Sequence, residues 1–403
     1  MSNADLRNTD RFRPDLFASA RKSGADHASG LRRPLSRIGG IPLRAEPTGA
    51  GRDIPAPDSP VKTGGPVSGG GRCSSGGWGA DGDPLRLARG RSDRDGPCFD
   101  LSIPPNGYAW WYVDGVSDDG KRAISIIAFI GSVFSPWYRW SGRQNPQNHC
   151  CLNVVTYGPG GRWSMTDRGE EALTLSRNTM QIGPSQMQWT GDELVISFRE
   201  RTTPHIGVLE GEIRITPSAI TQVEAALSPD GAHVWRPFAP VARIDVAIDR
   251  PGWNWSGHGY FDANFGVRAL EADFSYWTWG RFPTTDGATC FYDSTMRDGS
   301  QDTLAVAFDD EGAVRRVDPP PRAKVARSPW TVRRETRADP GYKPKQVLAM
   351  LDAPFYNRAV LRTQIDGLET DGVCEAVDLD RFRGPWLMPM LAVRVPRRRR
   401  WPG

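Results

Sequence analysis

The chain has 403 residues and carries 51 Lys and Arg against 47 Asp and Glu, a net charge of +4. The first 100 residues hold this whole excess but only four of the aromatic residues, whereas the rest of the chain is neutral and aromatic-rich. A neutral body argues against a dedicated nucleic-acid binder, and the longest apolar run, residues 123–133, is about half of a membrane-spanning helix.

Residues 1–95 have the composition of a disordered head. Segments such as 64–71 and 74–77 consist almost entirely of Gly, Ser and Pro. Sequence of this kind cannot bury enough apolar surface to offset the entropy of the chain. We therefore expect this head to be disordered and assign no chemistry to it.

From residue 96 onward, short runs rich in Val, Ile, Trp, Tyr and Thr recur between turn residues. This texture is typical of antiparallel strands, and no segment has the capped 3.6-residue periodicity of a long helix. The sequence predicts an all-β body of barrels or sandwiches. The clearest expected strands are 108–113, 122–134, 150–157, 162–166, 193–200, 206–216, 242–248 and 303–308.

The length of the body favours two domains over one. Pro251 and Gly252 interrupt the strand pattern, so we place the boundary there and predict domains at residues 96–249 and 250–396. Residues 346–357 are the one segment expected to form a short helix. The arginine-rich residues 397–403 are expected to form a solvated basic tail, with attraction to anionic lipid as the alternative.

Neither a metal site nor a nucleotide cofactor is expected. The six Cys and five His residues lie apart, without metal-ligand spacing, and no dinucleotide-binding or phosphate-binding glycine motif is complete. The N-terminus mixes acidic and basic residues and lacks the apolar core of a secretory signal. These observations predict a cytoplasmic protein with reduced thiols and no cofactor.

The segment 253–266 embeds one acidic residue, Asp262, among aromatic residues and glycines. On a strand, Tyr260 and Asp262 point to the same face, and His233 and Trp235 have the same spacing. A carboxyl group in an aromatic, water-poor cavity keeps its proton near neutral pH and can serve as a general acid. The alternatives are a capping role for Asp262 and a loop position for His233.

Five unusual segments occur in order: 107–112, 134–138, 148–154, 233–235 and 257–264. In these segments the chain resembles the carotenoid 1,2-hydratase family, also called hydroxyneurosporene synthase, of purple phototrophic bacteria. The resemblance covers about residues 100–395. It implies two lipocalin-like antiparallel β-barrels in tandem. It also implies a cofactor-independent hydro-lyase that adds water to the terminal 1,2 double bond of an acyclic carotenoid such as neurosporene or lycopene.

The resemblance implies Asp262 as the proton donor, supported by His233, Trp235 and Tyr260. Protonation at C2 leaves a tertiary carbocation at C1, which Trp235 and Tyr260 are expected to face with their π systems. For His233 two roles stay open: activation of the attacking water, or orientation of Asp262. We expect tryptophans to bind the polyene, foremost Trp137, Trp255, Trp277 and Trp279, with Trp110, Trp111 and Trp140 as further candidates. The alternative for each of these residues is ordinary core packing.

An acyclic carotenoid resides in the membrane, so the protein is expected to contact the inner or intracytoplasmic membrane peripherally. The main alternative is a non-catalytic carrier of an apolar polyene or lipid. A second alternative is a carbohydrate-active protein, which would need another acid near Asp262, such as Glu271 or Asp273. The preferred carotenoid, the number of ends hydrated and the oligomeric state do not follow from the sequence.

Overall fold

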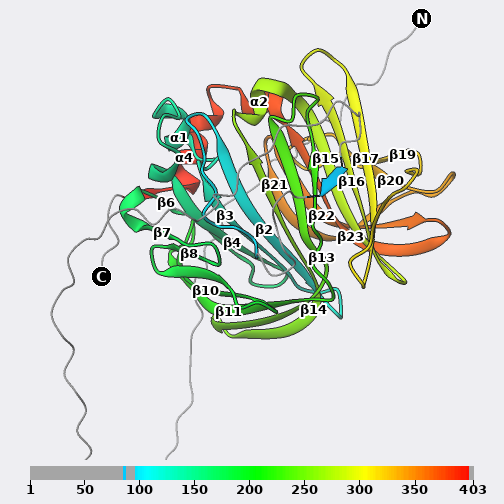
Figure 1. Ribbon diagram of the computed structural model, residues 1–403, viewed down its shortest axis with the longest axis horizontal. Helices are drawn as coiled ribbons and strands as arrows, with labels where there is room; N and C mark the ends of the chain where they lie inside the picture. Colours follow the sequence, from blue (N-terminus) through cyan, green and yellow to red (C-terminus); the bar gives the residue numbers. More distant parts are fainter. Residues whose placement is uncertain (1–84, 88–95, 399–403) are drawn as a thin grey trace, which may run out of the picture. The chain divides into compact units, whose positions relative to one another are not determined.

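The computed structural model describes residues 85–87 and 96–398 (Figure 1). These residues form mostly antiparallel β-structure with a few short helices. Of the predicted disordered head, all but β1 (Leu85–Leu87) lies outside the described residues. Residues 399–403 of the predicted basic tail also lie outside them.

Eight antiparallel strands close into a barrel. Each pairs with the next of the eight along the chain, and the last strand pairs back with the first. This up-and-down order removes the exposed edges that an open sheet would leave. The strands are β2 (Tyr108–Ser117), β3 (Ala123–Ile130), β4 (Cys150–Tyr157), β5 (Arg162–Ser164), β10 (Leu194–Thr202), β11 (Gly207–Pro217), β13 (His233–Arg250) and β14 (Trp253–Gly266).

Shorter strands extend this sheet. One group continues from β10 through β9 (Ser185–Trp189), β8 (Thr179–Ile182) and β7 (Leu173–Leu175). At the other side, β12 (Val223–Ala226) lies between β13 and β1. The pair β6 (Asp167–Arg168) and β24 (Arg397–Arg398) adjoins β4.

Successive side chains of each barrel strand point to opposite faces of the sheet, so the barrel strands contribute to two separate apolar cores. Trp111, Val113 and Phe261 are fully buried and pack with apolar residues from the other barrel strands, so they fill the interior of the barrel. Their neighbours Tyr112 and Tyr260 point outward and belong to a different cluster. Since the interior is filled, any site on these strands lies on the outer face of the barrel.

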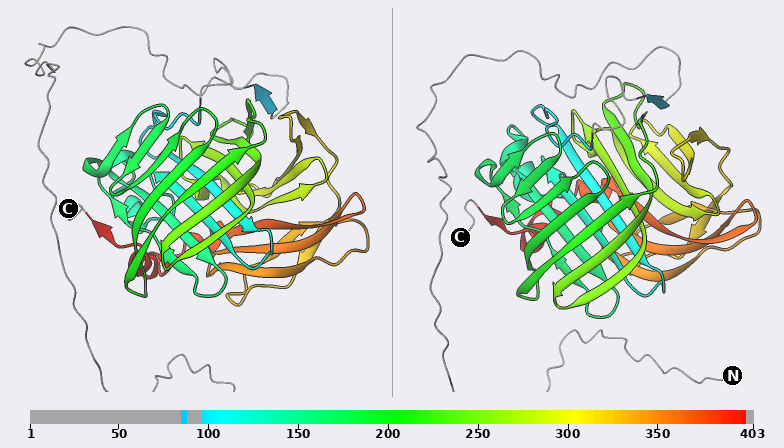
Figure 2. Two further views of the ribbon diagram at one scale, coloured as in Figure 1. Left: turned by 90° about the horizontal axis from the view of Figure 1, so that it is seen from below. Right: turned by 60° about the horizontal axis from the view of Figure 1, so that its bottom comes forward.

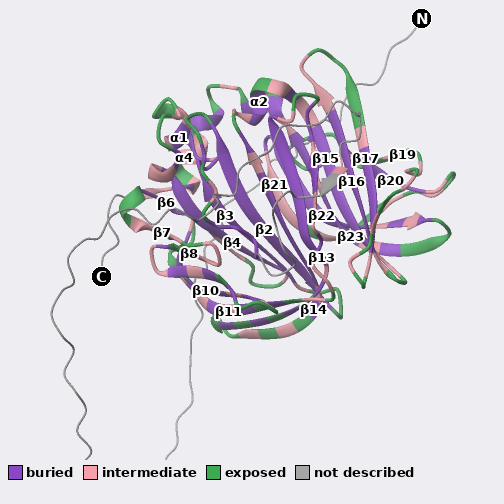
Figure 3. Cartoon of the chain, viewed as in Figure 1, coloured by how far each residue is buried: buried purple, intermediate pink, exposed green. Residues whose placement is uncertain are grey.

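A second, seven-stranded antiparallel sheet covers this outer face. Figure 2 shows the barrel and the second sheet side by side, and β2 and β3 beneath the contact are buried along their whole length (Figure 3). Residues of both sheets form one apolar cluster. In order across the sheet, the strands are β18 (Val314–Arg316), β17 (Gln301–Asp309), β16 (Gly287–Met296), β15 (Phe274–Thr284), β23 (Leu368–Asp378), β22 (Tyr356–Ile365) and β21 (Lys345–Ala353).

The prediction of two closed barrels is therefore corrected to one barrel and one open sheet. In the described part of the chain, the edge strands β18 and β21 each pair on one side only. The side chains on one face of the sheet pack against the barrel, and the other face carries a smaller apolar cluster that includes Phe282, Phe291 and Leu361. A separate two-stranded sheet is made by β19 (Arg322–Val325) and β20 (Arg334–Arg337).

Two local predictions are also corrected. The boundary at residue 250 falls in the tight turn between β13 and β14, and the chain passes to the second sheet only after Gly266. The predicted helix 346–357 is the hairpin of β21 and β22. Residues 346–357 form strands because pairing in the sheet with β22 and β23 and partial burial at its edge stabilise them more than their weak helical propensity would stabilise a helix.

Short helices lie at one end of the barrel (Figure 1). The Trp137 indole nitrogen donates to the Val395 carbonyl, at 2.7 Å, and joins the first helix to the end of the last. The tail prediction is wrong for Arg397, which forms a part-buried ion pair with Asp167. The helices are α1 (Pro136–Trp140), α2 (Leu270–Asp273), α3 (Leu379–Phe382) and α4 (Leu387–Arg394), with 3-10 turns at Pro146–Asn148 and Glu170–Ala172.

Candidate active site

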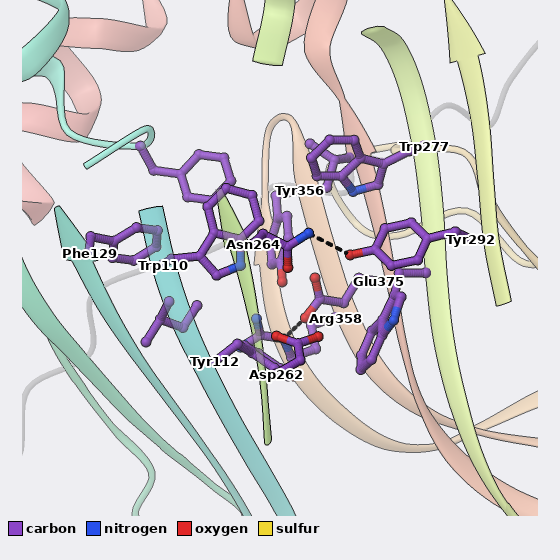
Figure 4. A pocket seen from close by; sticks show the side chains of 14 residues that line it. Trp110, Tyr112, Phe129, Asp262, Asn264, Trp277, Tyr292, Tyr356, Arg358 and Glu375 are labelled. Carbon is purple, nitrogen blue, oxygen red and sulfur yellow. Dashed lines mark hydrogen bonds and ion pairs between the residues drawn. The ribbon is translucent and has the colours of Figure 1, made fainter. Parts of the chain in front are cut away.

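The pocket that contains Asp262 lies between the outer face of the barrel and the second sheet (Figure 4). Asp262 and Asn264 reach it from β14, and Tyr112 lies opposite Asp262 on β2. The pocket is small, with a cavity volume of about 40 Å³. The complete lining is Trp110, Tyr112, Ile127, Phe129, Phe134, Asp262, Asn264, Trp277, Trp279, Tyr292, Tyr356, Arg358, Glu375 and Val377.

The two oxygens of the Asp262 carboxyl group have different surroundings. Oδ2 accepts hydrogen bonds from the Tyr260 hydroxyl at 2.7 Å and from the Trp235 indole nitrogen at 2.8 Å. Among the described residues, Oδ1 has no hydrogen-bond partner although it is buried. An oxygen that accepts two hydrogen bonds is the carbonyl-type oxygen of a neutral acid. A proton on Asp262 therefore resides on Oδ1.

Burial keeps this acid neutral. Asp262 is only 2 % exposed, and desolvation raises its pKa to about 8, against the opposing effect of the two hydrogen bonds. The charged form is disfavoured because a water-poor site solvates it poorly. At neutral pH Asp262 is thus a protonated carboxylic acid with its proton toward the pocket, the form that a general acid requires.

Trp235 and Tyr260 lie beside Asp262 as predicted, but they do not line the pocket. Both are completely buried. The pairing of β13 with β14 puts Trp235 opposite Asn264, within reach of Asp262. Their contact with Asp262 is through N–H and O–H groups, so they orient the acid, and the expectation that their π faces meet a carbocation is not met.

His233 lies at the start of β13 and not in a loop. Its Nδ1 is 2.8 Å from the Tyr108 hydroxyl, and its Nε2 is 2.6 Å from Asp273 Oδ2. Burial lowers the pKa of His233, and the hydrogen bond to Asp273 acts in the opposite direction. Since both ring nitrogens have other partners, His233 does not hydrogen-bond Asp262, and it is absent from the pocket lining.

The four tryptophans predicted to bind substrate divide into two groups. Trp277 and Trp279 line the Asp262 pocket. Trp137 lies on α1 and packs edge-to-face with Trp140, and Trp255 packs against the core inside the barrel. Neither Trp137 nor Trp255 lines this pocket, because β14 and α1 carry them to other faces. Of the further candidates, Trp110 lines the pocket, whereas Trp111 points into the barrel.

The sequence analysis missed the polar residues of the second sheet. Arg358 on β22 and Glu375 on β23 are directly paired across the strands, and the Arg358 Nε donates to Glu375 Oε1 at 2.6 Å. Across the pocket, the Asn264 side-chain amide donates to the Tyr292 hydroxyl at 3.2 Å. Strand register brings these residues together, so no local sequence signal marked them.

A larger apolar cavity adjoins the pocket and leads away from Asp262. Its cavity volume is about 320 Å³, and it shares Ile127, Phe129, Phe134, Tyr356 and Arg358 with the pocket. Its outer part is lined by α4, the β21–β22 hairpin and Trp330. The two spaces therefore adjoin at these shared residues, and apolar side chains predominate in the lining of both.

The carbohydrate-active alternative loses the two partner acids that were considered for Asp262. Glu271 is paired with Arg143, and Asp273 is paired with His233 and Arg268. Neither carboxylate lines the Asp262 pocket, so the pair of acids required for glycoside hydrolysis is not formed by these residues. Among the described residues, no group of three or more His, Cys, Asp or Glu side chains is arranged to hold a metal ion.

Comparison with known proteins identifies the family of this chain. Residues 126–403 match the family model described as carotenoid hydratase CrtC. The chain belongs to this family. The sequence-based resemblance is thereby confirmed.

Individual relatives carry the same family name. An acyclic carotenoid 1,2-hydratase of Cereibacter sphaeroides is 60 % identical over 277 residues, which are 68 % of this chain and 99 % of the relative. An acyclic carotenoid 1,2-hydratase of Rubrivivax gelatinosus is 36 % identical and covers 98 % of both chains. A solved structure, kievitone hydratase from Nectria haematococca, aligns with a TM-score of 0.45 and 12 % identity over 77 % of this chain and 98 % of that one.

Proposed function

We propose that this protein is an acyclic carotenoid 1,2-hydratase in which Asp262 protonates the terminal 1,2 double bond of a substrate such as neurosporene or lycopene. The single observation that carries the mechanism is the state of Asp262. It is a buried acid whose Oδ2 is held by two donors and whose Oδ1 has no partner among the described residues. The addition needs no cofactor, because the acid itself supplies the proton.

The carbocation that follows protonation is stabilised by the aromatic lining. A tertiary cation at C1 meets Tyr112 and Trp110 from the barrel and Trp277, Trp279 and Tyr292 from the second sheet. The negative face of an aromatic ring attracts a cation by about 2 kcal/mol or more in a desolvated site. The role first assigned to Trp235 and Tyr260 thus passes to rings that line the pocket.

The alternative of a passive polyene carrier is less well supported. A carrier requires the apolar cavity but gains nothing from a buried, protonated acid, which costs free energy to maintain. The closed, eight-stranded, up-and-down order of the barrel supports the lipocalin-like assignment of this barrel, a fold that both carriers and enzymes can use.

Incubation of the purified protein with lycopene or neurosporene in heavy-oxygen water tests the proposal. We expect a tertiary alcohol that carries one labelled oxygen, detected by mass spectrometry without any added cofactor. Bound but unchanged polyene, from protein whose fold is verified by circular dichroism, would favour the carrier.

The pH dependence of the hydration rate should follow the protonation of Asp262. Because activity requires the protonated acid and its pKa is raised to about 8, we expect the rate to fall tenfold per pH unit above about pH 8. In Tyr260→Phe, loss of a donor that favours the carboxylate raises the pKa, so the alkaline decline moves to higher pH. The maximal rate should fall about 10-fold as the orientation of Asp262 is lost.

Tyr138→Phe is the matched control for this profile. The Tyr138 hydroxyl is also buried, but it donates to the Gly107 carbonyl and does not line the pocket. Its alkaline decline should coincide with that of the wild type. An unchanged or downward-shifted decline in Tyr260→Phe would contradict the assignment.

We infer further that the protein contacts an anionic bilayer peripherally through α4. This helix is apolar on every side: Leu387 and Met388 are buried, Met390 and Leu391 line the large cavity, and Val393 is 74 % exposed. Trp386 at its start and Trp140 on the adjoining α1 are also exposed. Residues 381–403 contain seven Arg and no Asp or Glu, which complements anionic headgroups.

No helix in the described part of the chain is long and apolar enough to cross a membrane. A surface that inserts α4 into the headgroup region would bring the mouth of the cavity to the polyene without such a helix. This contact also gives a physical reason for leaving Trp386 and Val393 exposed.

Vesicle binding tests this contact. We expect the double variant Trp386→Ser/Val393→Ser to bind phosphatidylglycerol vesicles at least about 10-fold more weakly, because the apolar area that enters the bilayer is lost. Leu368→Ser is the control, since Leu368 is exposed at the far end of β22 and β23. Equal binding of vesicles by the double variant and the wild type in a sedimentation assay would refute membrane contact through α4.

A further inference from the structure

We propose that Glu375 accepts the proton of the attacking water, and that Arg358 is the positioning residue that holds its carboxylate in the pocket. This inference rests on the proposed hydration at Asp262. It replaces the water-activating role considered for His233, whose ring nitrogens are bound to Tyr108 and Asp273.

Glu375 and Asp262 reach the same pocket from opposite walls. Asp262 comes from β14 of the barrel and Glu375 from β23 of the second sheet (Figure 4). A double bond placed between the two walls has an acid on one side and a carboxylate on the other. The proton and the water can then add from different sides without either group having to move.

Arg358 fixes the carboxylate through contacts with both sheets. Its Nε donates to Glu375 Oε1 at 2.6 Å, and its Nη1 donates to Ser125 Oγ on β3 at 2.6 Å. The guanidinium also lies 4.9 Å from the centre of the Tyr112 ring. Arg358 is 2 % exposed, so its position is determined by packing, and a charge-assisted hydrogen bond of this kind sets direction as well as distance.

The two carboxyl groups have opposite electrostatic environments. Glu375 forms an ion pair with the Arg358 guanidinium. Asp262 has only neutral donors, and the negative charge of Glu375 adds to the burial that raises the pKa of Asp262. Two carboxyl groups with such different neighbours are the arrangement that can provide one general acid and one general base.

The proposed step balances. The π electron pair takes the proton from Asp262 Oδ1 and forms the C2–H bond, which leaves C1 electron-deficient. A lone pair of water forms the C1–O bond, and the O–H bond of the resulting protonated alcohol breaks as its proton passes to Glu375. The proton then returns from Glu375 to the Asp262 carboxylate through water, so one molecule of water is added and the protein is restored.

An ion-paired carboxylate is basic enough for this task. Water bound to a carbocation is a strong acid, so even a weakly basic group accepts its proton. The weak basicity also favours the return of the proton to Asp262. The Trp279 indole nitrogen, buried and without a partner among the described residues, lies on β15 opposite Glu375 and can donate a hydrogen bond to the water.

Glu375→Gln in heavy water separates this step from protonation. The glutamine keeps the shape and an acceptor for Arg358 but cannot take the proton. We expect hydration to fall at least about 100-fold, while protonation continues and reverses. Recovered lycopene should then carry deuterium at C2, faster than alcohol appears, as measured by mass spectrometry.

Glu369→Gln is the matched control, because Glu369 lies on the same strand, is exposed and pairs with Arg362; it should hydrate like the wild type. Hydration by Glu375→Gln within threefold of the wild type would overturn the proposal. So would joint loss of hydration and exchange with polyene binding intact. If Glu375→Gln does not bind polyene, Glu375→Asp decides: exchange outpacing hydration supports the proposal, and a parallel decline overturns it.

The acid is tested separately. Loss of deuterium exchange in Asp262→Asn supports protonation by Asp262 whatever the outcome at Glu375. Exchange that persists in Asp262→Asn would refute the proposed function and leave the measurement on Glu375→Gln to be interpreted on its own. Failure of the Asp262 assignment would leave exchange in Asp262→Asn. Failure of the Glu375 proposal would instead leave hydration in Glu375→Gln, or abolish hydration and exchange together while polyene still binds.

Discussion

Asp262→Asn is expected to lower hydration at least 1,000-fold, of the order that loss of a general acid produces (about 10²–10⁴), and to leave the fold intact. The side-chain carbonyl of asparagine can accept the hydrogen bonds from Tyr260 and Trp235 that Asp262 Oδ2 accepts. Its amide group then takes the place of the protonated Oδ1. The variant is thus a close copy of the neutral acid in shape and hydrogen bonding, but it has no proton of suitable acidity to give.

Stability provides the control for this variant. Between about pH 4 and pH 8 the folded protein keeps the Asp262 proton and the unfolded chain does not, so the free energy of unfolding of the wild type falls as pH rises, by about 1.4 kcal/mol per pH unit from this group. Asp262→Asn lacks this contribution. Denaturant unfolding at pH 5 and pH 8 should show the difference between the two proteins growing with pH in favour of the variant. A constant difference would mean that Asp262 is ionised in the fold.

Arg281→Met should have the largest effect on stability, a loss of about 3–5 kcal/mol. Arg281 on β15 is 2 % exposed, and its Nε donates at 2.7 Å to Asp114 on β2. Asp114 is completely buried and also accepts a hydrogen bond from Tyr112. The pair joins the second sheet to the barrel, and removal of the guanidinium leaves a buried carboxylate without its cation.

Arg362→Met is the matched control for this prediction. Arg362 pairs with Asp371 on β23, but both side chains are about one-third exposed, so its loss should cost less than about 1 kcal/mol. Urea unfolding of the two variants measures the comparison. Similar losses for both would show that the buried pair does not connect the two sheets energetically. A double variant Arg281→Met/Asp114→Leu should recover part of the stability, because no unpaired charge remains.

The local sequence pattern was sufficient to place Asp262 and Tyr260 on the same buried face of a strand. Tyr260 and Asp262 are two residues apart on a strand, so their shared face follows from the period of β-structure, and the surrounding aromatic residues indicate a water-poor site. Trp235 could be selected through the family resemblance, but its hydrogen bond to Asp262 depends on the register of β13 against β14.

Pro251, Gly252 and the segment 346–357 show why local pattern misled elsewhere. A Pro-Gly turn has the same sequence signal whether it joins two strands of one sheet or separates two domains, and here it joins β13 to β14. Residues 346–357 have mixed propensity, and their pairing partner in β22 decides the outcome. In both cases the outcome depends on how neighbouring strands pair, which the turn residues and local propensities do not specify.

The sequence by itself determined the strand-rich body, the family and the buried acid, because these depend on period-two alternation and on residues close together in the chain. Tertiary structure alone decided that the barrel is filled, that the site lies on its outer face beneath an open sheet, and that Glu375 and Arg358 face Asp262. The physical reason is that strand register and sheet packing join residues more than 90 positions apart, and hydrogen bonds between backbones carry no signature in the side chains of either strand.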